Sequence, residues 1–262
     1  MSESPMSRSD YFRILAAGLA AVGVWSGYSQ LLQILDSGSW VSHAVRLLPI
    51  APIAVLGAGL ASALRPTVVA VCARAAISMD EASLTSRLPS IITGAVWGAI
   101  ATTMFIGGSS ATAAWLFLAV LAPWIVWIDL RVQRIPTTLA YLAAGGTAAT
   151  TIVTGVVDDT GEAIVRALAA GAAAGATLFV LAVLLRGGIG LGDARLVVSL
   201  GMVLGYAGWV TLPAALIFAI LAAFVGVVLA RTIRMIRSEP AQSHIALGPF
   251  LALGSALALA VS

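Results

Sequence analysis

The chain has 262 residues, of which 60% are hydrophobic and only 10% charged, and its mean hydropathy is +1.04. One water-soluble core cannot bury so much apolar surface, so the composition excludes a soluble enzyme and predicts an integral membrane protein. The net charge of +3 comes from arginines without a lysine, and these lie in short connecting segments, where they are better suited to fixing topology than to binding nucleic acid.

Nine apolar stretches have about the length needed to cross roughly 30 Å of hydrocarbon as helices. They cover residues 13–35, 45–64, 90–107, 111–130, 136–156, 163–186, 194–210, 212–231 and 244–261. We therefore predict an all-α fold, a polytopic bundle of about nine transmembrane helices. The first ten residues are polar and the first stretch is long enough to span, which favours a retained helix over a cleaved signal peptide.

Between the second and third stretches, residues 65–89 carry charges of both signs, which is typical of a helix and loop on the membrane surface. This segment divides the chain into two predicted domains. Residues 1–88 would hold two transmembrane helices and the surface segment, and residues 89–262 would form a compact group of six or seven helices.

The arginines also predict the orientation, because cytoplasmic loops collect positive charge. Arginines mark the N-terminus and four later connections, at residues 65–87, 131–134, 186–195 and 231–237. The intervening loops hold Asp36 and the acidic group Asp158, Asp159 and Glu162, with Arg46 as the exception. The pattern alternates, and it places the N-terminus in the cytoplasm.

Small residues recur at four-residue spacing in two of the predicted helices, at Gly171 and Gly175 and at Gly201 and Gly205. Such pairs let two helices approach closely in lipid. A packing role is sufficient to explain both pairs.

Two aspartates lie at the predicted cytoplasmic boundary. Asp129 ends one apolar stretch, and Asp193 ends the loop GGIGLGD before another. The two aspartates are 64 residues apart, and the chain between them comprises a turn, one helix outward, one helix back and the glycine loop. An antiparallel pair of helices returns the chain to the face it left, so the two carboxylates can meet.

Carboxylates in a membrane are costly, by roughly 2.5–3.5 kcal/mol at mid-bilayer, so a retained one needs a reason. Two neighbouring carboxylates do not easily both ionise and share a proton instead. One can then act as a base towards water while the other, protonated, polarises a carbonyl group. This pattern predicts peptide hydrolysis without a covalent intermediate.

Gly190 and Gly192 precede Asp193 and would allow positive φ angles and the close approach of a substrate backbone. A purely structural interpretation of the aspartates stays open. In that interpretation Asp193 caps the N-terminus of the following helix, and Asp129 pairs with Arg131 at a helix end.

Three motifs resemble those of the type IV prepilin peptidases, a family of GxGD intramembrane aspartyl proteases. The first is Ile128-Asp129-Leu130 followed by Arg134-Ile135-Pro136, in which proline suits the start of a helix. The second is GLGD followed by Ala194-Arg195-Leu196, where the family usually has lysine at the arginine. The third is the segment from Leu247 to Gly254, which contains Gly248-Pro249-Phe250. The resemblance covers residues 89–262.

The resemblance implies that Asp129 and Asp193 are the catalytic pair. It implies prepilins or pseudopilins as substrates, cut at the cytoplasmic face between a short basic leader and a hydrophobic helix. Candidate substrate-binding residues are Gly190, Gly192, Arg134, Pro249 and Phe250, although Arg134 also suits a topology anchor. One departure from the family is His244-Ile245-Ala246, where the family reads closer to Ile-Pro-Phe.

No cofactor or metal is expected, because an aspartate pair needs neither and the sequence holds no ligand cluster. The single cysteine, Cys72, excludes a zinc site built from cysteine pairs. Many members of the family carry a cytoplasmic domain with cysteine pairs, and this domain methylates the product. We therefore expect peptidase activity without that methyltransferase domain.

Three other interpretations stay open. The presenilin branch of the same class pairs an aspartate with GLGD, but it would carry Pro-Ala-Leu where this chain has Pro249-Phe250. A proton-coupled transporter could use the same carboxylates, although such sites usually lie near the bilayer midplane. An inactive scaffold of a pilus or secretion assembly would use the aspartates only at helix ends.

Overall fold

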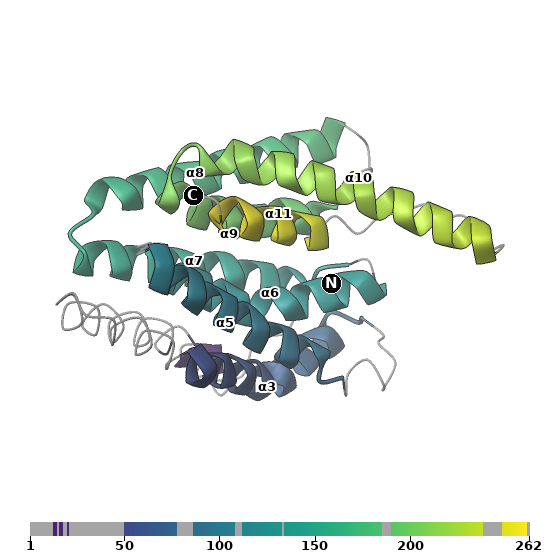
Figure 1. The fold of residues 1–262 in the computed structure, drawn as a ribbon, viewed down its shortest axis with the longest axis horizontal. Coiled ribbons are helices and arrows are strands. Elements are labelled where there is room, and N and C mark those ends of the chain that lie inside the picture. Colours follow the sequence, from purple (N-terminus) through teal and green to yellow (C-terminus); the bar gives the residue numbers. More distant parts are fainter. Residues whose placement is uncertain are drawn as a thin grey trace.

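The computed structural model describes residues 13–14, 16–17, 20, 50–77, 86–107, 112–132, 134–184, 190–237 and 248–260. Within these ranges the chain forms eight α-helices and no β-strand, in agreement with the predicted all-α class. The helices are α3 (Ile50–Arg74), α5 (Leu88–Gly107), α6 (Thr112–Val132), α7 (Thr137–Val157), α8 (Gly161–Leu184), α9 (Leu191–Ala207), α10 (Thr211–Arg237) and α11 (Gly248–Ala260) (Figure 1).

Each of the last eight predicted stretches corresponds to one of these helices, but the count of nine spans is not confirmed. In the described residues, five helices are long and apolar enough to cross a membrane: Pro52–Arg74, Ala113–Val132, Thr137–Val157, Gly161–Leu184 and Thr211–Leu229. Leu88–Ile100 and Gly248–Leu259 are shorter apolar helices, and α9 has 17 residues. The first predicted stretch, 13–35, lies almost entirely outside the described residues.

The predicted surface helix at residues 65–74 is instead the continuation of α3, which passes through Pro66 to Arg74. Proline removes one backbone donor and disfavours a helix interior. The residues after Pro66 compensate for this loss, because Thr67, Val68, Val71 and Cys72 are all buried. Burial of this apolar face therefore holds the helix together past the proline.

The helices fall into two groups (Figure 1). One group contains α3, α5, α6 and α7, and the other contains α8, α9, α10 and α11. In the second group α8 packs on α9 and α10 packs on α11, while α9 and α11 contact α6 and α9 also contacts α7. Helices α6 and α7 of the first group and α9 and α11 of the second therefore form the junction between the groups.

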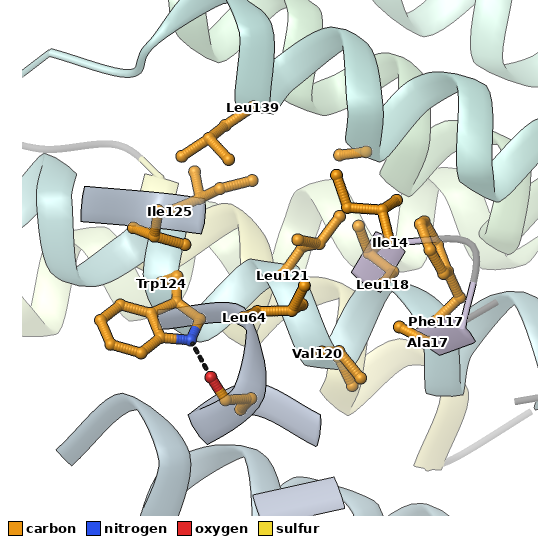
Figure 2. Close-up of a cluster of buried hydrophobic side chains, with 14 of the residues drawn as sticks. Ile14, Ala17, Leu64, Phe117, Leu118, Val120, Leu121, Trp124, Ile125 and Leu139 are labelled. Atoms are coloured by element: carbon orange, nitrogen blue, oxygen red, sulfur yellow. Dashed lines mark hydrogen bonds between the residues drawn. The ribbon is translucent and has the colours of Figure 1, made fainter. Parts of the chain in front are cut away.

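Helix α6 lies at the centre of the largest apolar cluster (Figure 2). Its buried residues include Phe117, Leu121 and Ile125, which are at most 1% exposed. Two indole N–H groups also join helices in this region. Trp97 of α5 donates to the Leu116 carbonyl of α6, and Trp124 of α6 donates to the Ala61 carbonyl of α3, each at 3.0 Å.

The two glycine pairs pack against each other, which confirms the predicted close approach of helices. A Cβ atom at Gly171 of α8 would lie 2.8 Å from the Val198 carbonyl oxygen of α9. A Cβ atom at Gly201 of α9 would lie 3.0 Å from Cα of Gly171. The contact surface thus has no room for side chains at these positions, and α8 fixes the position of α9.

Arg166 adds an exception to the predicted charge pattern, because it lies in α8 close to the acidic group at residues 158–162. Its Nε donates to the Gly205 carbonyl at 2.7 Å and its Nη2 to the Tyr206 carbonyl at 2.8 Å. These are terminal carbonyls of α9, where a cation is favourable. The predictions for Arg8, Asp36, Arg46, Arg186 and His244 concern positions outside the described residues.

Candidate active site

Asp129 lies near the end of α6, three residues before the helix ends at Val132. The helix forms because its sequence is almost entirely apolar, and that apolar face is buried up to Ile128. Asp129 follows in the same environment and is only 5% exposed. A short turn then leads through Pro136, whose φ of −57° and ψ of 127° suit the residue before α7.

Asp193 lies in the first turn of α9 and is 8% exposed. The N-cap residue of this helix is Gly190, which makes no side-chain cap hydrogen bond. The interpretation of Asp193 as the N-cap is therefore wrong, because the helix begins at Leu191 rather than at Ala194. The carboxylate is nevertheless close to the helix N-terminus, where negative charge is favourable.

The two carboxylates meet beside Gly248, the first residue of α11. A Cβ atom built on Gly248 would lie 3.0 Å from Oδ2 of Asp129 and 3.9 Å from Oδ1 of Asp193. The two oxygens are therefore no further apart than the sum of these distances. Three helices distant in sequence, α6, α9 and α11, converge on this point.

The same two oxygens lack hydrogen-bond partners. Within the described part of the chain, neither Oδ2 of Asp129 nor Oδ1 of Asp193 accepts a hydrogen bond, although both atoms are buried. Buried carboxylate oxygens are normally satisfied, and exceptions concentrate at functional sites. The site thus presents two acceptors towards one small volume.

The electrostatics of Asp193 favour a protonated carboxyl group. This residue lies outside the five candidate membrane spans. Burial and, to a smaller extent, the nearby charge of Asp129 raise the pKa of Asp193 to about 6, against the opposing effect of a hydrogen bond from the backbone N–H of Gly190. Asp193 can therefore hold a proton close to neutral pH.

The two glycines before Asp193 do not have the predicted positive φ angles. Gly190 is extended, with φ of −71° and ψ of 136°, and Gly192 lies within α9. Their small size matters for space instead. A Cβ atom at Gly190 would lie 3.2 Å from Oδ2 of Asp193, and one at Gly192 would lie 2.9 Å from Cβ of Ile135, in the turn before α7.

The other predicted site residues lie at different distances from this centre. Arg134 is exposed in the turn between α6 and α7. Pro249 and Phe250 follow Gly248 in α11 and are partly buried. The Phe250 ring packs over Gly226 of α10, where a Cβ atom would lie 2.6 Å from the ring. Phe250 thus contacts α10 within the chain.

Two nearby arginines lie over aromatic rings. The Arg131 guanidinium is 4.5 Å from the centre of the Trp127 ring, and that of Arg195 is 5.6 Å from the centre of the Tyr141 ring. With Oδ2 of Asp129 unpartnered and Arg131 over Trp127, the structure does not favour the interpretation of Asp129 as part of a helix-end ion pair.

Gly248 is not among the site residues predicted from the sequence, although its backbone lies against both carboxylates. The signal was present, because Gly248 opens the third motif, directly before Pro249 and Phe250.

Among the described residues, no group of three histidine, cysteine or acidic side chains is placed to hold a metal ion.

Comparison with known proteins agrees with the resemblance. Residues 115–230 match the model of the type IV leader peptidase family, and this region contains both aspartates. The match confirms the resemblance to prepilin peptidases and indicates a leader peptidase. No curated protein and no solved structure matches the chain.

Proposed function

We propose that this chain, whose residues 115–230 match the type IV leader peptidase family, is an aspartyl endopeptidase of the bacterial cytoplasmic membrane. It would remove the short basic leader from prepilin-like or pseudopilin substrates at the cytoplasmic face, with its own N-terminus in the cytoplasm. The catalytic residues would be Asp129 and Asp193.

One observation carries this proposal: two buried carboxylates from different helices direct unpartnered oxygens to the same point beside Gly248. Two aspartates used only at helix ends would have no reason to converge. Burying two carboxyl groups together is unfavourable unless they share a proton, and that state is the one that acid–base chemistry requires.

In the mechanism, Asp193 begins protonated, in keeping with its raised pKa, and Asp129 begins ionised. Asp129 removes a proton from water as the oxygen attacks the scissile carbonyl, and the Asp193 proton moves to the carbonyl oxygen. The tetrahedral intermediate then collapses, the C–N bond breaks, and the amine leaves with the proton that Asp129 had accepted. As the carbonyl re-forms, one hydroxyl group of the intermediate returns its proton to Asp193. The second product is therefore the carboxylic acid, and the pair is again singly protonated.

The proposed substrate contacts follow from the surroundings of this pair. Gly190 is exposed beside Asp193, and its lack of a side chain leaves the backbone accessible to an extended peptide, while Gly192 lets the start of α9 approach Ile135. Pro249 and Phe250 set the position of Gly248 at the start of α11. Arg134 is exposed close to the end of α6 and could bind an acidic group of the substrate.

The test is coexpression of the full chain with prepilin-like substrates, followed by the change in gel mobility on leader removal. Wild type is compared with Asp129→Asn and Asp193→Asn, which keep the side-chain size but remove the titratable proton. Asp159→Asn is the matched control, because it makes the same change in an exposed residue at the opposite end of α7.

We expect wild type and Asp159→Asn to cut and the two site variants to lose at least about a thousandfold in rate, since neither base nor acid can be replaced. Cleavage by both site variants, stably inserted, would overturn the mechanism. If all four proteins left every substrate intact, the inactive scaffold would be favoured. Proton-coupled uptake into vesicles, abolished by both variants, would favour the transporter.

A further inference from the structure

A second polar site lies between α3 and the start of α5, on residues that the proposed peptidase does not use. It is a cavity of about 400 Å³. Two arginines, Arg65 and Arg87, and three serines, Ser62, Ser86 and Ser90, contribute to its lining. Among the described residues that line it, none is acidic. The described part of the lining therefore contributes positively charged side chains and several hydroxyl groups.

Two of the three serine hydroxyls are placed to donate to a ligand, because that of Ser62 already donates to the Ala58 carbonyl at 2.8 Å. Ser90 is 8% exposed and lines the cavity, where its hydroxyl can donate a hydrogen bond. The Ser86 hydroxyl accepts a hydrogen bond from the Leu88 N–H at 3.2 Å, which leaves its own hydrogen available to donate. Both hydroxyls thus suit an acceptor-rich ligand.

The backbone adds to the same preference. Ser86 and Arg87 immediately precede α5, a helix of 20 residues, and Ser90 and Ile91 lie in its first turn. The Leu88 N–H donates to Ser86, Pro89 has no N–H, and the Ile91 N–H donates to the Arg87 carbonyl. The backbone therefore contributes mainly through the helix macrodipole, which makes this end favourable for anions. A phosphate group combines a negative charge with several acceptor oxygens, as this lining requires.

The surroundings identify the source of such a phosphate. Ile91, which lines the cavity, is 61% exposed, and Leu88 on the same helix is 49% exposed. Val55, one turn before the cavity residue Ala58 of α3, is 72% exposed. These apolar side chains belong to helices of membrane-spanning or nearly spanning character, so acyl chains can cover them.

We propose that this cavity binds the phosphate headgroup of an anionic membrane lipid, with Arg87 and Ser90 as ligands and the acyl chains against the exposed faces of α3 and α5. Arg65 contributes charge from α3. This lipid would bridge α3 and α5. The site is independent of the peptidase activity and would exist in an inactive chain.

The test uses the purified full chain in detergent and measures lipid binding by native mass spectrometry. Phosphatidylglycerol and phosphatidylcholine with identical acyl chains are titrated separately. We expect one tightly retained phosphatidylglycerol and at least severalfold weaker retention of phosphatidylcholine. Equal retention of the two lipids would overturn the proposal.

Two variants locate the site. Arg87 is exposed, so Arg87→Gln is expected to leave the fold intact, and it should weaken phosphatidylglycerol binding about tenfold through loss of a charge-assisted hydrogen bond. Ser90→Ala should weaken it by a smaller factor. Arg231→Gln removes the same charge from an exposed position in α10 and should bind like wild type.

Equal weakening by Arg87→Gln and Arg231→Gln would show general charge attraction and would overturn the site. Competition with inorganic phosphate then tests whether the site binds a lipid headgroup or free phosphate. At millimolar concentration it should compete only weakly with phosphatidylglycerol if the acyl chains contribute. Complete displacement of the lipid by inorganic phosphate would show a soluble-phosphate site and would overturn the assignment to a lipid.

Discussion

Gly248 has no side chain and lies where the two carboxylates meet. Substitution of Gly248 is therefore the most direct single test of the site. In Gly248→Ala, the new Cβ atom would lie 3.0 Å from Oδ2 of Asp129, closer than ordinary contact, and would occupy the volume beside Oδ1 of Asp193. We expect the cleavage rate to fall by about 10- to 100-fold, because small displacements of catalytic groups are costly.

The measurement for Gly248→Ala is the initial rate of leader removal at equal protein levels. Gly161→Ala at the start of α8 is the control, because a Cβ atom there meets no other group within 4 Å. A Gly248→Ala variant as fast as wild type would mean that the reacting atoms do not pass this point.

The raised pKa of Asp193, about 6, also predicts how stability depends on pH. Below the ordinary pKa of an aspartate, near 4, the carboxyl group is protonated in both folded and unfolded chains and carries no penalty. As pH rises through about 6, the unfolded chain has already lost its proton and the folded protein must ionise a buried group, so stability is lost.

Asp193→Asn removes that penalty. Its Tm in detergent, relative to wild type, should therefore increase as the pH is raised from 4 to 7 and should level off above that range. Asp159→Asn, at an exposed position, should show no comparable trend. A difference in Tm between Asp193→Asn and wild type that stayed constant with pH would contradict the burial of an ionisable carboxyl group at this position.

At the scale of the elements, α8 positions the helix that carries Asp193. Gly171→Ala would place a Cβ atom 2.4 Å from Cγ of Met202 and 2.8 Å from the Val198 carbonyl oxygen, so α8 and α9 would have to separate. We expect a loss of about 1–3 kcal/mol in the free energy of unfolding, the usual cost of overpacking. Cleavage should also slow, since Asp193 moves with α9.

Gly161→Ala is the matched control on the same helix, and it should change stability little or raise it slightly, because alanine is the better helix former. Thermal unfolding of both variants in detergent is the measurement. Equal Tm values for Gly171→Ala and Gly161→Ala would show that the α8–α9 contact is looser than the structure indicates.

The helices were largely predictable because each depends on a local property, the length of an apolar stretch. The glycine pairs were predictable for the same reason, since their four-residue spacing lies within one helix. The passage of α3 through Pro66 was not, because the compensating burial of Val68, Val71 and Cys72 comes from other helices. Local chemistry favours a break at that proline.

The site was predictable only in part. The sidedness of Asp129 and Asp193 follows from counting helices between them, and the structure brings the two residues together. The interpretation of the GLGD glycines as positive-φ residues was wrong, because the chain enters α9 through an extended Gly190. The third motif contains Gly248, but its place beside both carboxylates could not be predicted, because it depends on how α11 packs against α6 and α9.

At the scale of the whole molecule, the predicted boundary at residue 88 does not coincide with a gap in the apolar core. The central cluster combines Leu64 and Val68 of α3 with Trp97 of α5 and residues of α6, α7 and α9. Helix α3 thus packs into the region that carries Asp129. The division into domains 1–88 and 89–262 remains a proposal, and the chain offers a direct way to measure how strongly its two parts are joined.

Trp124 provides that measurement, because its indole N–H joins α6 to the Ala61 carbonyl of α3 across the proposed boundary (Figure 2). Trp124→Phe removes the donor and with it this hydrogen bond between helices, which should cost about 0.5–1.5 kcal/mol beyond the loss of ring volume. Trp115, in the same helix, is the matched control, because its buried Nε1 makes no hydrogen bond within the described residues.

Trp115→Phe removes the same atoms but also removes an unsatisfied donor, so the two substitutions should differ in effect although their chemistry is identical. We expect a clearly lower Tm for Trp124→Phe than for Trp115→Phe in detergent. If α3 is coupled to the active site through this bond, Trp124→Phe should also slow leader cleavage at temperatures where it is fully folded. Equal Tm values and equal rates for the two variants would mean that residues 1–88 neither stabilise nor position the catalytic helices through Trp124.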